Sequence, residues 1–185
     1  IVLDGTVGIY SDSFYGGHTL IGLGGQHYLF GFIAIFYNNH NSITTLYSHD
    51  HCTIAFFDIP PGLSSVEFIR STPPQILSNI YEMLTIHIRD DFDRQQIINS
   101  KSVKVKLARY MIYSSKNAGS MQFDIKMNRT ELSNFLGAYR TTLSRELSRM
   151  EREGLIRTEG SLITILDYRK LLDIEMTSYY GAEDI

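Results

Sequence analysis

The pattern of apolar and polar positions divides the chain into a first third typical of strands and a remainder typical of helices. Up to residue 58, short apolar and β-branched runs alternate with clusters of Gly and Asn, as strands alternate with turns. The predicted strands lie within Ile1–Val7, His18–Leu23, Ile43–Tyr47 and Cys52–Phe57. Strands this short, at this spacing, favour a small barrel or sandwich.

A helical pattern follows Pro60-Pro61-Gly62, and its longest stretch begins after Pro73-Pro74 and continues to Ile98. Apolar residues recur there at steps of three and four, as on one face of a helix. The stripe consists of Ile76, Ile80, Met83, Leu84, His87 and Ile88. At about 1.5 Å per residue, roughly 25 residues would span nearly 40 Å. So small a barrel could not cover that length, so we expect a partner helix in a homodimer, with a core helix of a monomer as the alternative.

The stretch from Asn128 to Ile165 predicts two short helices and a hairpin, after a hinge at residues 99–102 and one further helix. Asn128 and Glu131 have the spacing of a capping box, and Gly137 permits the left-handed turn that ends the first helix. The second helix is predicted from about Arg140 to Glu153. Its inner stripe consists of Leu143, Leu147 and Met150, and the hairpin of Leu155-Ile156, Glu159-Gly160 and Leu162–Ile165. This order is that of a winged helix-turn-helix.

The net charge of −3 conceals an uneven distribution along the chain. Residues 1–100 hold 3 Lys+Arg and 9 Asp+Glu, whereas residues 101–170 hold 14 and 7. A basic segment between acidic ones favours contact between one module and a polyanion, with a solvated charged surface as the alternative.

Arginines and small hydroxyl residues on the outer side of the second helix suit the major groove of DNA, because Arg can donate two hydrogen bonds to guanine. The candidate DNA-binding residues are Arg129, Thr130, Arg140, Thr141, Ser144, Arg145 and Arg149. The alternative is an ordinary charged helix face. The ordered sequence of capped helix, glycine turn, second helix and hairpin favours DNA.

Residues 128–165 resemble the DNA-binding domain of the catabolite-activator/fumarate-nitrate (CRP/FNR) regulator family. The motifs that carry the resemblance are Arg129-Thr130-Glu131-Leu132, Leu136-Gly137, Arg140-Thr141-Thr142-Leu143-Ser144-Arg145 and Glu151-Arg152-Glu153-Gly154-Leu155-Ile156. Leu3–Val7 resembles the glycine-turn strand of the family's cyclic-nucleotide-binding-like barrel, and Phe30–Ala34 its phosphate-cassette entry. Thr141 stands where the family commonly has Glu, and Tyr139 where Ser or Thr usually caps the helix.

The resemblance implies an α+β fold with three parts. They are an N-terminal β-barrel (a jelly-roll-like double-stranded β-helix) at residues 1–72, a dimerisation helix at 73–99 and a winged helix-turn-helix domain at 100–185. It also implies a homodimer, a palindromic operator in double-stranded DNA, RNA polymerase as a partner and a small effector. By the family plan, roughly forty residues of barrel would lie upstream of Ile1, and the chain lacks an initiator Met.

The effector pocket implied by the resemblance departs from that of nucleotide-binding members. Its residues are Gly31, Phe32, Ile33, Asn41, Ser42 and Thr44. Phe32 replaces the acid that accepts the ribose hydroxyl, and Asn41 replaces the Arg that pairs with the cyclic phosphate, so we expect no cyclic AMP. The single cysteine, Cys52, cannot ligate an iron–sulfur cluster alone, and we expect no cofactor.

The remaining signals are weaker. His49 and His51 share a face of a strand and could bind a metal with His40, but we expect polar turn residues and no metal. No Gly-x-Ser-x-Gly, Walker or His-Glu-x-x-His motif is present, so an enzyme is not expected. No apolar run approaches a membrane span, and the lone cysteine fits a cytoplasmic location. The rival function is a small-molecule-binding barrel that signals to a protein partner.

We expect cyclic AMP not to bind, because Phe32 and Asn41 offer neither the acceptor nor the cation that the nucleotide requires. Isothermal titration calorimetry at physiological nucleotide concentrations should give no heat of binding. A dissociation constant in the micromolar range would contradict the prediction.

Overall fold

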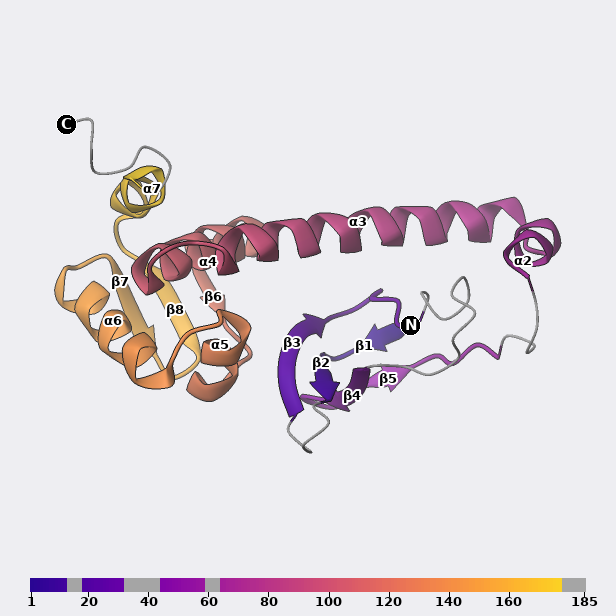
Figure 1. Ribbon diagram of the computed structural model, residues 1–185, viewed down its shortest axis with the longest axis horizontal. Helices are drawn as coiled ribbons and strands as arrows, with labels where there is room; N and C mark the ends of the chain where they lie inside the picture. Colours follow the sequence, from indigo (N-terminus) through magenta and orange to yellow (C-terminus); the bar gives the residue numbers. More distant parts are fainter. Residues whose placement is uncertain (13–17, 32–43, 59–63, 178–185) are drawn as a thin grey trace. The chain divides into compact units, whose positions relative to one another are not determined.

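The computed structural model describes the chain except for residues 13–17, 32–43, 59–63 and 178–185 (Figure 1). It divides into two compact units, Ile1–Asp90 and Asp91–Ile185. Helices and sheets both occur, which confirms the mixed α+β class. No helix in the described part of the chain is long and apolar enough to span a membrane.

The N-terminal unit contains five short strands. They are β1 (Val2–Asp4), β2 (Val7–Asp12), β3 (His18–Gly24), β4 (Thr44–Ser48) and β5 (Thr53–Ile54). β2 pairs antiparallel with both β3 and β4, and β1 pairs with β5. Val2, Val7 and Leu20 are the buried apolar side chains here. The described strands form two separate sheets rather than a closed barrel.

A tight corner at Gly5 divides the predicted first strand into β1 and β2. Gly5 has φ +87°, and a Cβ there would lie 2.3 Å from the His51 carbonyl oxygen, so only glycine fits. The Thr6 amide donates to Asp50 Oδ1 at 2.7 Å, and the Cys52 thiol donates to the Thr6 carbonyl at 3.1 Å. The polar residues before β5 therefore form the second side of this corner.

The histidines near this corner were the candidate metal ligands. His49 Nε2 lies 3.4 Å from the Tyr10 hydroxyl. No group of three possible ligands occurs among the residues that the structure describes, and His40 lies outside them.

The long helix α3 (Pro74–Ile98) has the predicted bounds and follows the short capped helix α2 (Ser65–Ser71). Ile97 is its only buried residue. His87, part of the predicted stripe, stacks on Tyr28 with ring centroids 3.8 Å apart. By contrast, Tyr81, Ile88 and Phe92 are 71%, 69% and 62% exposed. At roughly 100° per residue these three share a face rotated from the centre of the predicted stripe.

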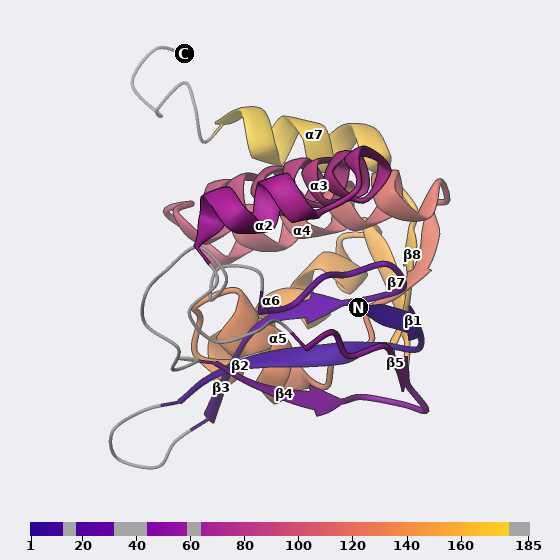
Figure 2. The same ribbon diagram turned by 90° about the vertical axis from the view of Figure 1, so that its right-hand side faces the viewer.

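The C-terminal unit packs helices against a three-stranded antiparallel sheet of order β6-β8-β7 (Figures 1 and 2). Its elements are α4 (Val103–Ala118), β6 (Gln122–Asp124), α5 (Arg129–Phe135), α6 (Arg140–Arg152), β7 (Ile156–Glu159), β8 (Leu162–Ile165) and α7 (Tyr168–Thr177). α7 packs along α4, as both views show. The fully buried residues include Leu107, Met111, Leu132, Leu136, Leu143, Met150, Ile163 and Leu171. The predicted helix, turn, helix and hairpin are confirmed.

The capping box of α5 is formed as predicted, and it provides a test of this fold. Asn128 Oδ1 accepts from the Thr130 and Glu131 amides at 2.9 and 3.0 Å, and Glu131 Oε2 accepts from the Asn128 amide at 2.8 Å. Asn128→Ala should lower the free energy of unfolding by about 1 kcal/mol. Denaturant titration followed by circular dichroism measures the change. Asn128→Asp, which keeps the acceptor, is the control, and equal stability of the Ala and Asp variants would contradict the prediction.

Candidate nucleic-acid interface

The orientation of α6 follows from its buried stripe. Leu143, Leu147 and Met150 are at most 3% exposed, so the opposite side of the helix faces outward. The exposed residues of α6 include Arg140, Thr141, Ser144, Arg145, Ser148 and Arg149. Arginines and hydroxyls therefore lie together on the outward side, as the sequence pattern indicated.

The N-terminus of α6 has no side-chain cap. Tyr139 occupies the N-cap position with extended backbone, makes no capping hydrogen bond and is 84% exposed. The first amides of a helix have no intrahelical acceptor and carry the positive end of the helix dipole. This end of α6 is therefore suited to approach a phosphate.

The arginines of α6 differ in how far their side chains are engaged. Arg140 and Arg145 make no hydrogen bond or ion pair with any described residue. Arg149 instead donates from Nε to Glu153 Oε1 at 2.8 Å. Glu153 also accepts from Lys104 Nζ at 2.8 Å, and these two cations, Lys104 above all, lower the pKa of the Glu153 carboxyl. Arg140 and Arg145 are therefore more available to a ligand than Arg149.

The first helix and the wing lie beside α6. Thr130 is exposed and Arg129 half-buried in the first turn of α5. Glu151 of α6 accepts hydrogen bonds from the Thr158 amide, at 2.8 Å, and from the Thr158 hydroxyl, which fixes the wing to the helix. Arg157 in β7 is exposed, and the sequence analysis did not identify it. The alternation of Ile156, Arg157 and Thr158 along one strand was the available signal.

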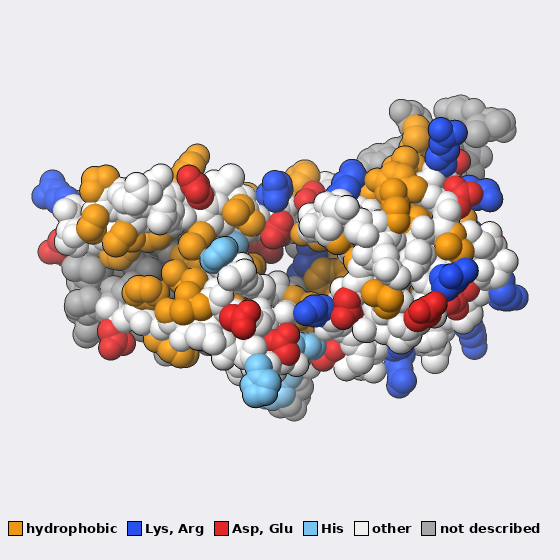
Figure 3. Space-filling model, turned by 180° about the vertical axis from the view of Figure 1, so that it is seen from behind, with side chains coloured by type: hydrophobic (Ala, Val, Ile, Leu, Met, Phe, Trp, Pro, Cys, Tyr) orange, Lys and Arg blue, Asp and Glu red, His pale blue; other side chains and the backbone are white. Residues whose placement is uncertain are grey.

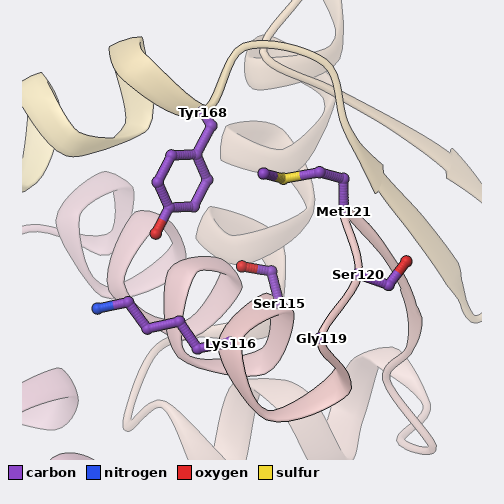
Figure 4. Close-up of a pocket in the computed structure, with 6 residues that line it drawn as sticks. All are labelled: Ser115, Lys116, Gly119, Ser120, Met121 and Tyr168. Carbon is purple, nitrogen blue, oxygen red and sulfur yellow. The ribbon is translucent and has the colours of Figure 1, made fainter.

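Figure 3 shows Lys and Arg side chains (blue) spread over the C-terminal unit, mixed with acidic ones. A pocket in the same unit is lined by Ser115, Lys116, Gly119, Ser120, Met121 and Tyr168 (Figure 4). It lies between the end of α4, the turn into β6 and the start of α7, and none of the predicted site residues lines it.

Only part of the predicted effector pocket is described. Gly31 is exposed, and Thr44 begins β4 and is half-buried. Phe32, Ile33, Asn41 and Ser42 lie outside the described residues.

Comparison with known proteins places the helical unit in a family. The profile of the Crp-like helix-turn-helix domain matches residues 105–174, from α4 to α7. The transcriptional activator protein FnrA of Stutzerimonas stutzeri is 29% identical over 99 residues, which cover 51% of this chain and 41% of that protein. The transcriptional activator protein Anr of Pseudomonas aeruginosa is 28% identical over 115 residues, which cover 60% and 45%. The chain belongs to the CRP/FNR family of transcriptional regulators.

Solved structures of CRP/FNR regulators share the fold. A CRP-family regulator from Thermus thermophilus matches with a TM-score of 0.68 and 16% identity, over 98% of this chain and 89% of the other. FixK2 from Bradyrhizobium japonicum matches with a TM-score of 0.64 and 18% identity, over 94% and 85%. The chain spans less than half the length of the two activators above. Membership of a regulator family agrees with the prediction that the chain is not an enzyme.

Proposed function

We propose that this chain is a cytoplasmic, homodimeric regulator that binds a two-fold symmetric operator in double-stranded DNA through α6. The observation that carries the proposal is the outward side of α6. There Arg140, Arg145, Thr141 and Ser144 are exposed opposite a fully buried stripe, within a Crp-like helix-turn-helix domain.

The recognition step assigns different work to different residues. The uncapped N-terminus of α6 enters the major groove, where Arg145 donates two hydrogen bonds to a guanine. Thr141 and Ser144 contact neighbouring bases over a shorter reach. Arg129 and Thr130 on α5, and Arg157 on the wing, contact phosphates, which gives affinity without sequence preference.

The homodimer is formed through the exposed apolar face of α3. Tyr81, Ile88 and Phe92 are separated by seven and four residues, the spacing of one face in a two-helix coil. Their exposure in a single chain supports burial against the same face of a second copy, since large exposed apolar side chains on one face mark an interaction site. A symmetric dimer presents two α6 helices to two half-sites.

A small effector other than cyclic AMP controls the dimer through the N-terminal unit, and the chain needs no metal or cluster. RNA polymerase is the proposed partner at the promoter, since two relatives are named transcriptional activators. The rival function, signalling to a protein without DNA, predicts no retention on DNA. Retention on a DNA column at low salt and its loss at high salt separate the two functions.

Arg145→Ala should weaken binding to the preferred operator by about 1–3 kcal/mol and relax the preference at one base pair, because a bidentate guanine contact is lost. Arg149→Ala is the matched control on the same helix, since Arg149 is engaged by Glu153. Fluorescence anisotropy with operator and random duplexes measures both variants. If Arg145→Ala weakens both duplexes equally, Arg145 contacts the backbone and the assignment is wrong.

Ile88→Glu should convert the dimer into a monomer at micromolar concentration, because it places a charge in the proposed helix interface. Ile86→Glu is the matched control. Ile86 is also exposed, at 49%, but lies two residues away, on a different side of α3. Sedimentation velocity measures both. A wild-type monomer, or equal dissociation by the two variants, would contradict the interface.

A further inference from the structure

Two lysines in the first turns of α4 reach the ends of the two helices of the helix-turn-helix. Lys106 Nζ donates to the Leu136 and Gly137 carbonyls at 2.9 and 3.1 Å. Lys104 Nζ donates to Glu153 Oε2 at 2.8 Å. Leu136 is the C-cap of α5, and Glu153 is the C-cap of α6. Both lysines therefore act at helix C-termini.

We propose that Lys104 and Lys106 are positioning residues that hold α5 and α6 by their C-terminal ends, and that they do not contact DNA phosphates. The proposal rests on the proposed function, because the orientation they hold is that of the DNA-reading helix. It assigns to internal structure two cations from the segment whose positive charge predicted a polyanion partner.

Lys106 satisfies the turn between the two helices. The last carbonyls of a helix have no intrahelical donor, and the negative end of the helix dipole favours a cation. α5 is only seven residues long, and Gly137 follows it with φ +57°. The Ala138 amide donates to the Ser133 carbonyl at 2.9 Å, so the turn folds back on α5. The Lys106 ammonium closes this turn on its open side through two more carbonyls.

Lys104 compensates an unfavourable charge at the end of α6. The Glu153 carboxylate lies at the negative end of the α6 dipole, where an anion is disfavoured. Lys104 and Arg149 both donate to this carboxylate, one to each oxygen. The Lys104 side chain is 25% exposed, and that of Glu153 is 36% exposed. The carboxylate thus links α4 to α6.

The two lysines reach different targets because residues two apart on a helix do not share a face. Lys106 joins α4 to a turn 30 and 31 residues away, and Lys104 joins it to a residue 49 away. α4 is therefore connected to the end of each helix independently of the buried core. Loss of either contact frees one helix end without opening the apolar packing.

The test compares Lys106→Met, Lys106→Arg and Lys104→Met with the wild-type chain on its selected operator and on random DNA. Lys106→Met should weaken operator binding on the order of tenfold, since a charge-assisted hydrogen bond is lost. It should leave random-DNA affinity and the salt slope unchanged. Lys106→Arg should restore operator binding, and Lys104→Met should have a smaller effect because an exposed ion pair contributes less.

Lys101→Met is the matched control, because Lys101 is exposed and makes no hydrogen bond or ion pair with the described residues. Circular dichroism verifies that each variant is folded, so a general loss of stability would not change the operator-to-random ratio. A salt slope reduced by about one, with an unchanged ratio, would show that Lys106 contacts phosphate and would overturn the proposal.

Amide hydrogen exchange at Ala138 keeps this inference separate from DNA binding. Lys106→Met should speed exchange there, and Lys106→Arg and Lys101→Met should not. If the wild-type chain shows no operator preference, the proposed function fails, and the exchange rates still decide whether Lys106 holds the turn. Unchanged exchange in Lys106→Met would overturn the positioning role.

Discussion

Burial of Leu143, Leu147 and Met150 fixes the one surface through which this chain can read DNA. Burying a side chain of this size stabilises a protein by about 1.5–3 kcal/mol. Rotation of α6 by one residue, roughly 100°, would bring Ser144 or Arg145 into that core. The core therefore selects which residues of α6 face outward. The capped α5, the Gly137 turn and the wing then hold this helix at its end, its start and its side.

The positive charge of the C-terminal unit is divided between internal structure and an outward surface. Arg109 donates from Nη1 to the Gln96 carbonyl at 2.7 Å and to Ser100 Oγ at 2.9 Å. The Arg94 guanidinium lies 5.0 Å from the centre of the Phe135 ring. With Lys104 and Lys106, these cations hold helices together. A charge count by itself thus overstates the surface available to a polyanion, which Arg140 and Arg145 represent more faithfully.

Features that depend on neighbouring residues were predictable, and those that depend on distant residues were not. The Asn128–Glu131 capping box, the Gly137 turn and the bounds of α3 follow from local spacing. The contacts of Lys104 and Lys106 join residues 30 to 49 apart, which no periodicity reveals. The exposed face of α3 was also misjudged, because the pattern cannot show that His87 stacks on Tyr28. The Gly5 corner required the backbone of His51 to be seen.

Selection of random duplexes by the purified chain, followed by sequencing at near-physiological salt, tests the central claim most directly. A homodimer that reads DNA through two α6 helices predicts a two-fold symmetric motif. Its half-sites should lie about one helical turn, or a multiple of it, apart, because each occupies one major groove on the same face of the duplex. No enrichment, or enrichment of a single asymmetric half-site, would contradict the account.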